Sequence, residues 1–275
     1  MTNRPSTPSP KGDRSAGELT GQVQSLTRGL SILECLAKAE GGLTLTDIGH
    51  RVLLPPSTVH RLLATLEKMG YVYQAGELGR WYVGLQAFTV GSSFLSSRDF
   101  VAQSHPFMRR LMDQSGETVN LAILDGTEAV FVDQVQCREM MRTIVKLGSR
   151  APLHASGVGK AMFASLPDDQ IDAILKVRGL PRITGNTITT PETMWASIRV
   201  IRQRGWSFDD EEHASGTRCV GSPIYDEHAE TLGAISLAGP SSRLPDERIK
   251  QLGPLVAHTA EELSRRLGGK WPHGR

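Results

Sequence analysis

Apolar residues recur every three or four positions between residues 25 and 69, and this period predicts helices. A helix over residues 25–39 would carry one apolar face, made of Leu26, Leu30, Leu33, Leu36 and Ala37. A later helix would carry a second face, made of Val59, Leu62, Leu63, Leu66 and Met69. The later helix begins near Pro55-Pro56, where a proline costs nothing because the first turn needs no N–H partner. The two faces predict one small helical core.

A short helix is expected between these two. Thr44 and Asp47 have the i, i+3 spacing of a capping box, which begins a helix that ends near Leu53. Two helices with a tight break, the second with a small, polar and basic outer face, are the parts of a helix-turn-helix that places its last helix in the major groove. The residues that we expect to reach base edges and phosphates are Thr46, Ser57, Thr58, His60 and Arg61.

Two β-prone runs, residues 71–74 and 80–83, follow the last helix and are separated by a glycine-containing loop. This pattern predicts a hairpin, and a hairpin directly after a recognition helix is the wing of a winged helix-turn-helix. Arg80 on the wing is expected to reach the DNA backbone or minor groove. We therefore predict a DNA-binding domain over residues 21–84, the alternative being a small α/β subdomain with no DNA role.

The rest of the chain predicts a helical linker and a second domain. Residues 85–114 look helical, with a bend or restart at His105-Pro106. Residues 115–270 alternate strands and helices, from a hairpin at Asp125-Gly126 to a long helix over 246–267, with a further strand expected at 142–146. Helices packed on an antiparallel sheet make an α+β domain of the kind that senses ligands.

Composition adds a few exclusions. At 275 residues the chain can hold two domains, and its formal charge of +2 neither favours nor excludes nucleic acid. The three cysteines have no close pair, so we expect neither a disulfide framework nor a cysteine-based metal site. No apolar run is long enough for a membrane span, so the protein is expected to be cytoplasmic with no membrane partner. Residues 1–20, rich in Pro, Ser, Gly and charge, predict a disordered tail.

Residues 153–161 superficially resemble a phosphate-binding loop. The pattern fails because His154 stands where the first glycine is required and Ala161 replaces the Ser or Thr. A Ser156-Gly157 turn that opens a helix remains, and free amides at a helix N-terminus bind small anions. The alternative is tight helix–strand packing with no ligand.

Residues 209–213 form an acidic cluster that ends in His213 and is expected to be a solvated loop. No second His or Cys stands at metal-ligand spacing, so no metal is expected. Cys219 opens an apolar strand, where a buried inert thiol is the default. Cys219, either His154 or His213, and Asp209 are the residue types of a cysteine nucleophile with its base and orienting acid, but sequence spacing cannot establish their geometry. A cysteine hydrolase is therefore kept only as the alternative to a non-enzymatic regulator.

Several separate motifs, spread over residues 22–268, resemble the IclR family of bacterial transcription regulators. They are residues 26–30, the Pro-Ser-Thr-Val-His-Arg-Leu-Leu run at 56–63, the Gly-Tyr-Val at 70–72, and residues 154–161, 210–213 and 216–220. The resemblance implies a winged helix-turn-helix joined to a GAF/PAS-like effector domain. It also implies homodimers or homotetramers, a pseudo-palindromic double-stranded operator, and no cofactor other than a small-molecule effector.

Within the family, residues 107–112, 115–120, 147–150 and 239–244 most resemble the glyoxylate-responsive repressors of allantoin utilisation. This resemblance implies glyoxylate or a similar 2-oxo acid as effector, with pyruvate, glycolate or an aromatic acid as alternatives. The effector contacts that it implies are Ser156, Gly157, Val158, Asp209, Cys219, Ser236, Leu237 and Ala238. At the last of these positions a serine is expected, so Ala238 removes one hydroxyl contact.

Overall fold

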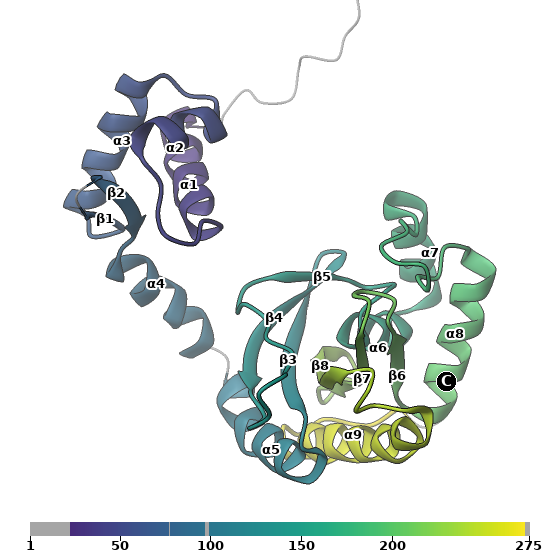
Figure 1. The fold of residues 1–275 in the computed structure, drawn as a ribbon. Coiled ribbons are helices and arrows are strands. Elements are labelled where there is room, and N and C mark those ends of the chain that lie inside the picture. The colour runs from purple at the N-terminus through teal and green to yellow at the C-terminus, as the bar shows by residue number, and fades with distance from the viewer. Residues whose placement is uncertain (1–22, 77, 97–98, 273–275) are drawn as a thin grey trace, which may run out of the picture. The chain divides into compact units, whose positions relative to one another are not determined.

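The computed structural model describes residues 23–76, 78–96 and 99–272. The chain forms two compact units, which divide between Phe94 and Leu95 (Figure 1). The tail expected at residues 1–20 lies outside the described residues. The helical linker expected at 85–114 is split, because its first helix falls in the N-terminal unit and its second in the C-terminal unit.

The N-terminal unit has helices α1 (Gln24–Ala37), α2 (Leu45–Val52) and α3 (Pro56–Lys68), then the hairpin β1 (Val72–Ala75) and β2 (Arg80–Val83), and then α4 (Leu85–Ser96). Its core is one apolar cluster centred on fully buried Ile32, Ile48, Val59 and Leu63. Trp81 of β2 joins this cluster, and Leu43 exchanges backbone hydrogen bonds with Trp81, so the hairpin is fastened to the helices.

Local side chains begin and end α2. Thr44 accepts a hydrogen bond from the Asp47 amide, and the Asp47 carboxylate accepts one from the Thr44 amide, which confirms the expected capping box. The helix ends at Leu53, whose φ of 54° reverses the chain into Pro55. This reversal sets the angle between α2 and α3, and Gly49 permits it because an added Cβ would lie 3.1 Å from the Leu54 carbonyl oxygen.

The C-terminal unit is built on a six-stranded antiparallel sheet in the order β5-β4-β3-β8-β7-β6. Its strands are β3 (Thr118–Asp125), β4 (Glu128–Val135), β5 (Arg150–Pro152), β6 (Ser207–Asp210), β7 (Thr217–Tyr225) and β8 (Thr231–Pro240). Its helices are α5 (Asp99–Ser115), α6 (Gly157–Ser165), α7 (Asp168–Arg178), α8 (Pro191–Arg204) and α9 (Asp246–Arg266). The α+β class expected from the sequence is confirmed.

Two apolar layers cover the two faces of this sheet, and Figure 1 shows the sheet curling between them. Helices α5 and α9 pack on one face, where Val119, Val220 and Leu237 are buried. Helices α6 and α8 pack on the other, around Ala122, Phe131 and Ala234. Because side chains alternate along a strand, the residues between those of the first layer point to the α6 side.

Three sequence expectations need correction here. Residues 142–146 form no strand, because the short edge strand next to β4 is instead made by Arg150–Pro152. Of the bend or restart expected at His105-Pro106, the restart does not occur, because helix α5 runs through Pro106. This helix is also no simple linker, since its buried Met108 and Leu111 belong to the core of the sheet domain.

Candidate DNA interface and effector site

The proposed DNA-contacting residues lie together on the outer surface of the helix-turn-helix. Thr46 is exposed on the first turn of α2, and Ser57, His60 and Arg61 are exposed on α3, while Thr58 is partly covered. Their helix faces outward because Val59 and Leu63 on its other side are fully buried. A contiguous polar surface at the start of a recognition helix is what major-groove reading requires.

Arg80 lies on the wing as expected and also makes a contact within the protein that the sequence did not predict. Its guanidinium is part-buried, and its Nη1 donates a hydrogen bond to the Gly42 carbonyl 3.0 Å away. The side chain therefore fastens the wing to the loop before α2. A DNA role for Arg80 would require its remaining N–H groups.

The apolar stripe of α3 is only half buried, which differs from the single core expected. Leu62, Leu66 and Met69 line an open space of about 610 Å³ together with Leu26 and Leu30 of α1. Leu26 is 62% exposed, Leu30 51% and Met69 58%. We call this surface the α1–α3 hollow.

On the C-terminal unit, the N-terminus of α6 supplies free amides. Ser156 is its N-cap, and its Oγ accepts from the Gly159 amide at 3.1 Å while donating to the Pro152 carbonyl at 2.8 Å. The Lys160 amide bonds back to the Ser156 carbonyl. The amides of Gly157 and Val158 precede the first bond within the helix, and such groups attract anions.

Sheet register brings the other expected polar residues to the same place. Asp209 of β6 is directly opposite Cys219 of β7, which is opposite Ala238 of β8. The start of α6 lies on this row, because a Cβ added at Gly157 would come within 2.8 Å of Cys219 Cβ. Residues 82 positions apart in sequence, Ser156 and Ala238, thus line one region.

Asp209 is an unusual group in this region. It is 2% exposed, and its Oδ1 accepts hydrogen bonds from the amides of Glu212 and His213. Burial raises the pKa of Asp209 to about 7, and the Glu212 charge adds to the rise while Lys160 opposes it. Burial also raises the pKa of Cys219, and the adjacent Asp209 adds to this, so the thiol stays protonated and is a poor nucleophile.

The acidic cluster is not the solvated loop expected from the sequence. Glu212 is 5% exposed and pairs with Lys160, itself 3% exposed on α6. Thr187 donates to the Glu212 carbonyl, so the loop after α7 holds the acidic turn in place. One sequence signal could have predicted the Lys160–Glu212 pair. Lys160 is in a helix whose other residues are all small or apolar, and a lysine buried in such a helix needs an acidic partner.

Two expected contacts reach this region only through their backbones. The Leu237 side chain is fully buried in the layer under α5 and α9, and the Val158 side chain is buried among α6 and α8. Ser236, by contrast, lies on the α6 side of β8. Sequence reasoning missed two residues of the same side, Thr118 and Asn120 of β3, which are the register partners of Ala238 and Ser236.

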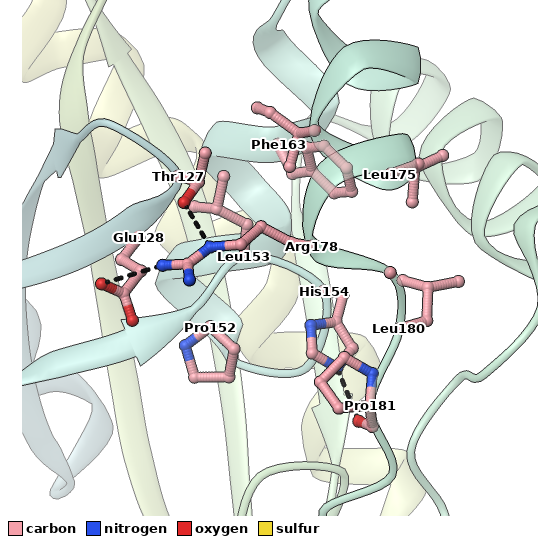
Figure 2. Close-up of a pocket in the computed structure, with 12 residues that line it drawn as sticks. Thr127, Glu128, Pro152, Leu153, His154, Phe163, Leu175, Arg178, Leu180 and Pro181 are labelled. Atoms are coloured by element: carbon pink, nitrogen blue, oxygen red, sulfur yellow. Dashed lines mark hydrogen bonds and ion pairs between the residues drawn. The ribbon is translucent and has the colours of Figure 1, made fainter. Parts of the chain in front are cut away.

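His154 stands beside this region on the turn between β5 and α6. Its Nε2 lies 3.0 Å from the Pro181 carbonyl, to which it can only donate, and burial lowers its pKa, so the ring is neutral (Figure 2). Among the described residues, no group of three or more His, Cys, Asp or Glu is arranged to hold a metal ion. No helix in the described part of the chain is both long and apolar enough to cross a membrane.

Comparison with known proteins identifies the family. The profile of the IclR helix-turn-helix domain matches residues 25–76, and that of the bacterial transcriptional regulator IclR C-terminal domain matches residues 92–265. The chain belongs to the IclR family. The solved IclR structure of Thermotoga maritima has the same fold, with a TM-score of 0.77 and 28% identity over 90% of this chain and 100% of that one.

Two repressors show where the chain lies within the IclR family. The acetate operon repressor of Salmonella typhimurium is 49% identical over 91% of this chain and 92% of its own length. The repressor AllR of Escherichia coli is 43% identical over 90% of this chain and 92% of its own. The allantoin-type branch expected from the motifs is therefore the less similar of these two relatives. Both are transcriptional repressors and not enzymes, which leaves the cysteine hydrolase without support.

Proposed function

We propose that this IclR-family protein is a repressor whose operator binding is controlled by a small 2-oxo acid, with glyoxylate favoured. The observation that carries the effector proposal is the meeting of the free Gly157 and Val158 amides with buried Asp209 and its neighbour, the partly buried Cys219. Amides at a helix N-terminus bind a carboxylate, and a protonated or hydrogen-bonding Asp209 binds the hydroxyls of a hydrated aldehyde.

The remaining candidates complete such a site. Ser236 supplies a hydroxyl from β8, and the Cys219 thiol contacts the aldehyde end. A two-carbon acid has few atoms, and the ceiling of about 1.5 kcal/mol per heavy atom keeps its affinity micromolar or weaker. A nanomolar affinity in a titration would point to a larger physiological ligand.

Pyruvate is the second candidate, because Ala238 stands where a serine was expected. Ala238 is 2% exposed and lies opposite Cys219, so the site has a methyl group in the place of a hydroxyl. The methyl group of a methyl ketone would pack against the Ala238 side chain. The variant Ala238→Ser should therefore weaken pyruvate binding relative to glyoxylate binding.

For DNA reading we propose that two copies bind a pseudo-palindromic operator through Ser57, Thr58, His60 and Arg61, with Thr46 and Arg80 at phosphates.

We further propose that a second copy covers the α1–α3 hollow, because a surface with three large side chains more than half exposed is typical of an interface. Leu30→Glu should lower the dimer fraction in sedimentation, whereas Val200→Glu on the exposed side of α8 should not.

The first experiment is an operator-shift assay with DNA from the gene's own upstream region, with and without millimolar glyoxylate or pyruvate. Release of the operator DNA by one of the two acids would support the role of the C-terminal domain as a sensor and would identify the effector. Ser236→Ala should need a higher acid concentration for release while binding DNA normally. Operator binding that neither acid changes would still support a DNA-binding regulator, but it would rule out a 2-oxo acid as the effector.

A further inference from the structure

A cavity lies at the β5 edge of the sheet, which is the edge opposite to β6. It has a volume of about 190 Å³ and opens among the β3–β4 turn, the β5–α6 turn, α6 and α7 (Figure 2). None of its lining residues is among the proposed effector contacts, which gather on β6, β7, β8 and the first turn of α6. The sheet order places β3 and β4 between β8 and the edge strand β5. The two regions are therefore separate.

Most of the cavity wall is apolar. Leu153 and Phe163 are buried in the α6 layer, and Leu175 and Leu180 close the α7 side. A dry apolar cavity of roughly 150 Å³ is large enough to bind benzene in an engineered protein. The present cavity is somewhat larger, so it admits a compact apolar body of about that size with a small substituent.

One cation lies at the rim of this apolar space. The Arg178 guanidinium reaches from the end of α7 to the β3–β4 turn, where its Nε donates to Thr127 Oγ1 at 2.7 Å and its Nη2 lies 3.4 Å from Glu128 Oε2 (Figure 2). A guanidinium has five N–H donors, so this anchoring leaves donors for a ligand. Arg150 also pairs with Glu128, so the single carboxylate of Glu128 is shared by two arginines.

The opposite side of the cavity contributes a neutral group. His154 donates from Nε2 to the Pro181 carbonyl, and its lowered pKa keeps the ring uncharged. The cavity thus combines an apolar wall, a neutral imidazole, the Glu128 carboxylate paired with two arginines, and donors of Arg178 that remain unused. These are the features of a site that orients a small molecule by one charged end.

We propose that this cavity is a second ligand site, which takes a small monocarboxylate with a compact apolar body, its carboxylate on Arg178 and its body against Leu153, Phe163 and Leu175. The ligand would contact the same β5–α6 turn that ends in Ser156. A metabolite bound there would therefore touch the segment that presents the amides of the effector site, without occupying that site.

The test is calorimetric titration of the full chain with benzoate as the probe. We expect a dissociation constant of about 1 mM or tighter, unchanged when glyoxylate or pyruvate is saturating. Leu175→Trp fills the cavity and should abolish the binding. Val177→Trp adds the same side chain to the same helix at an outward position that is 78% exposed, and it should bind benzoate as the wild type does.

A second variant tests the charged end without filling the space. Arg178→Gln should weaken benzoate by about tenfold, the size of one charge-assisted hydrogen bond, while the binding of neutral benzamide stays the same. The proposal is wrong if the wild type does not bind benzoate, if a 2-oxo acid displaces it, or if folded Arg178→Gln and Leu175→Trp both bind it like the wild type.

Discussion

The two units use their functional residues in opposite ways. In the N-terminal unit most of the proposed DNA contacts are exposed side chains on α2 and α3, and with Arg80 of β2 they lie within 35 residues of each other in sequence. In the C-terminal unit the proposed effector contacts are buried, apart from the partly buried Cys219, and come from four elements between residues 156 and 238. An exposed reading surface needs only a stable scaffold behind it. A buried polar site needs every group in it to have a partner or a ligand.

The difference also appears in what holds each site in place. The inner side of α3 packs into an apolar cluster that includes Ile48, Val59 and Leu63. Around the effector region lie a buried ion pair and a buried carboxyl whose pKa is raised by burial. Variants of the first site should therefore affect DNA binding alone, whereas variants of the second should affect stability as well.

The largest effect is expected from Lys160→Met. It leaves Glu212 buried without its cation, and loss of one partner of a buried pair costs about 3–5 kcal/mol. Urea unfolding followed by tryptophan fluorescence should show this loss, since three of the four tryptophans lie in the C-terminal unit. Adding Glu212→Leu should restore most of the stability. Equal stability of the single variant and the wild type would show that the pair is solvated.

The second effect concerns DNA binding alone. Arg61→Ala removes an exposed cation from α3 and should weaken operator binding by about 1–3 kcal/mol, the range for one base-reading contact. Effector titration should be unchanged, because the residue lies in the other unit. Loss of both activities together would indicate misfolding and would remove the contrast between the units.

The third effect depends on pH. Since burial raises the pKa of Asp209 from 3.8 to about 7, the folded chain keeps a proton that the unfolded chain releases between these values. Its stability must therefore fall as the pH rises through that window, by up to about 1.4 kcal/mol for each unit of pKa difference. Asp209→Asn keeps the acceptor for the two amides and should flatten the curve. Asp210→Asn, which loses an ion pair with Arg218, should leave the pH dependence as it is.

The smallest effect is local to α2. Thr44→Ala removes the capping box and should cost about 1 kcal/mol, seen as faster amide hydrogen exchange in residues 45–52. Thr44→Ser keeps the hydroxyl and serves as the control. If exchange also rose in the C-terminal unit, the two units would share their stability and the comparison would fail.

The sequence predicted the N-terminal unit closely because its determinants are local. The Thr44–Asp47 capping box, the proline at the start of α3 and the glycine-containing loop of the hairpin each act over a few residues, and all three are present. The contact of Arg80 with Gly42 was not predicted, since it spans 38 residues and no local pattern encodes it.

In the C-terminal unit the helices were found by their period, but the site depended on strand order and register. Whether Leu237 or Ser236 faces α6 is decided by one residue of register, and the sequence alone cannot fix it. Likewise, the edge strand Arg150–Pro152 is too short for a pattern and forms only because β4 is there to pair with it.

What the sequence by itself determined is therefore the family, the winged helix-turn-helix and the α+β class, because periodicity, caps and turns are properties of neighbouring residues. Only the tertiary structure decided that Asp209 and Glu212 are buried, that Lys160 balances Glu212, and that a second cavity forms beside Arg178. Burial and charge pairing depend on residues that are distant in the chain, so they become defined only when the sheet and its helices have packed.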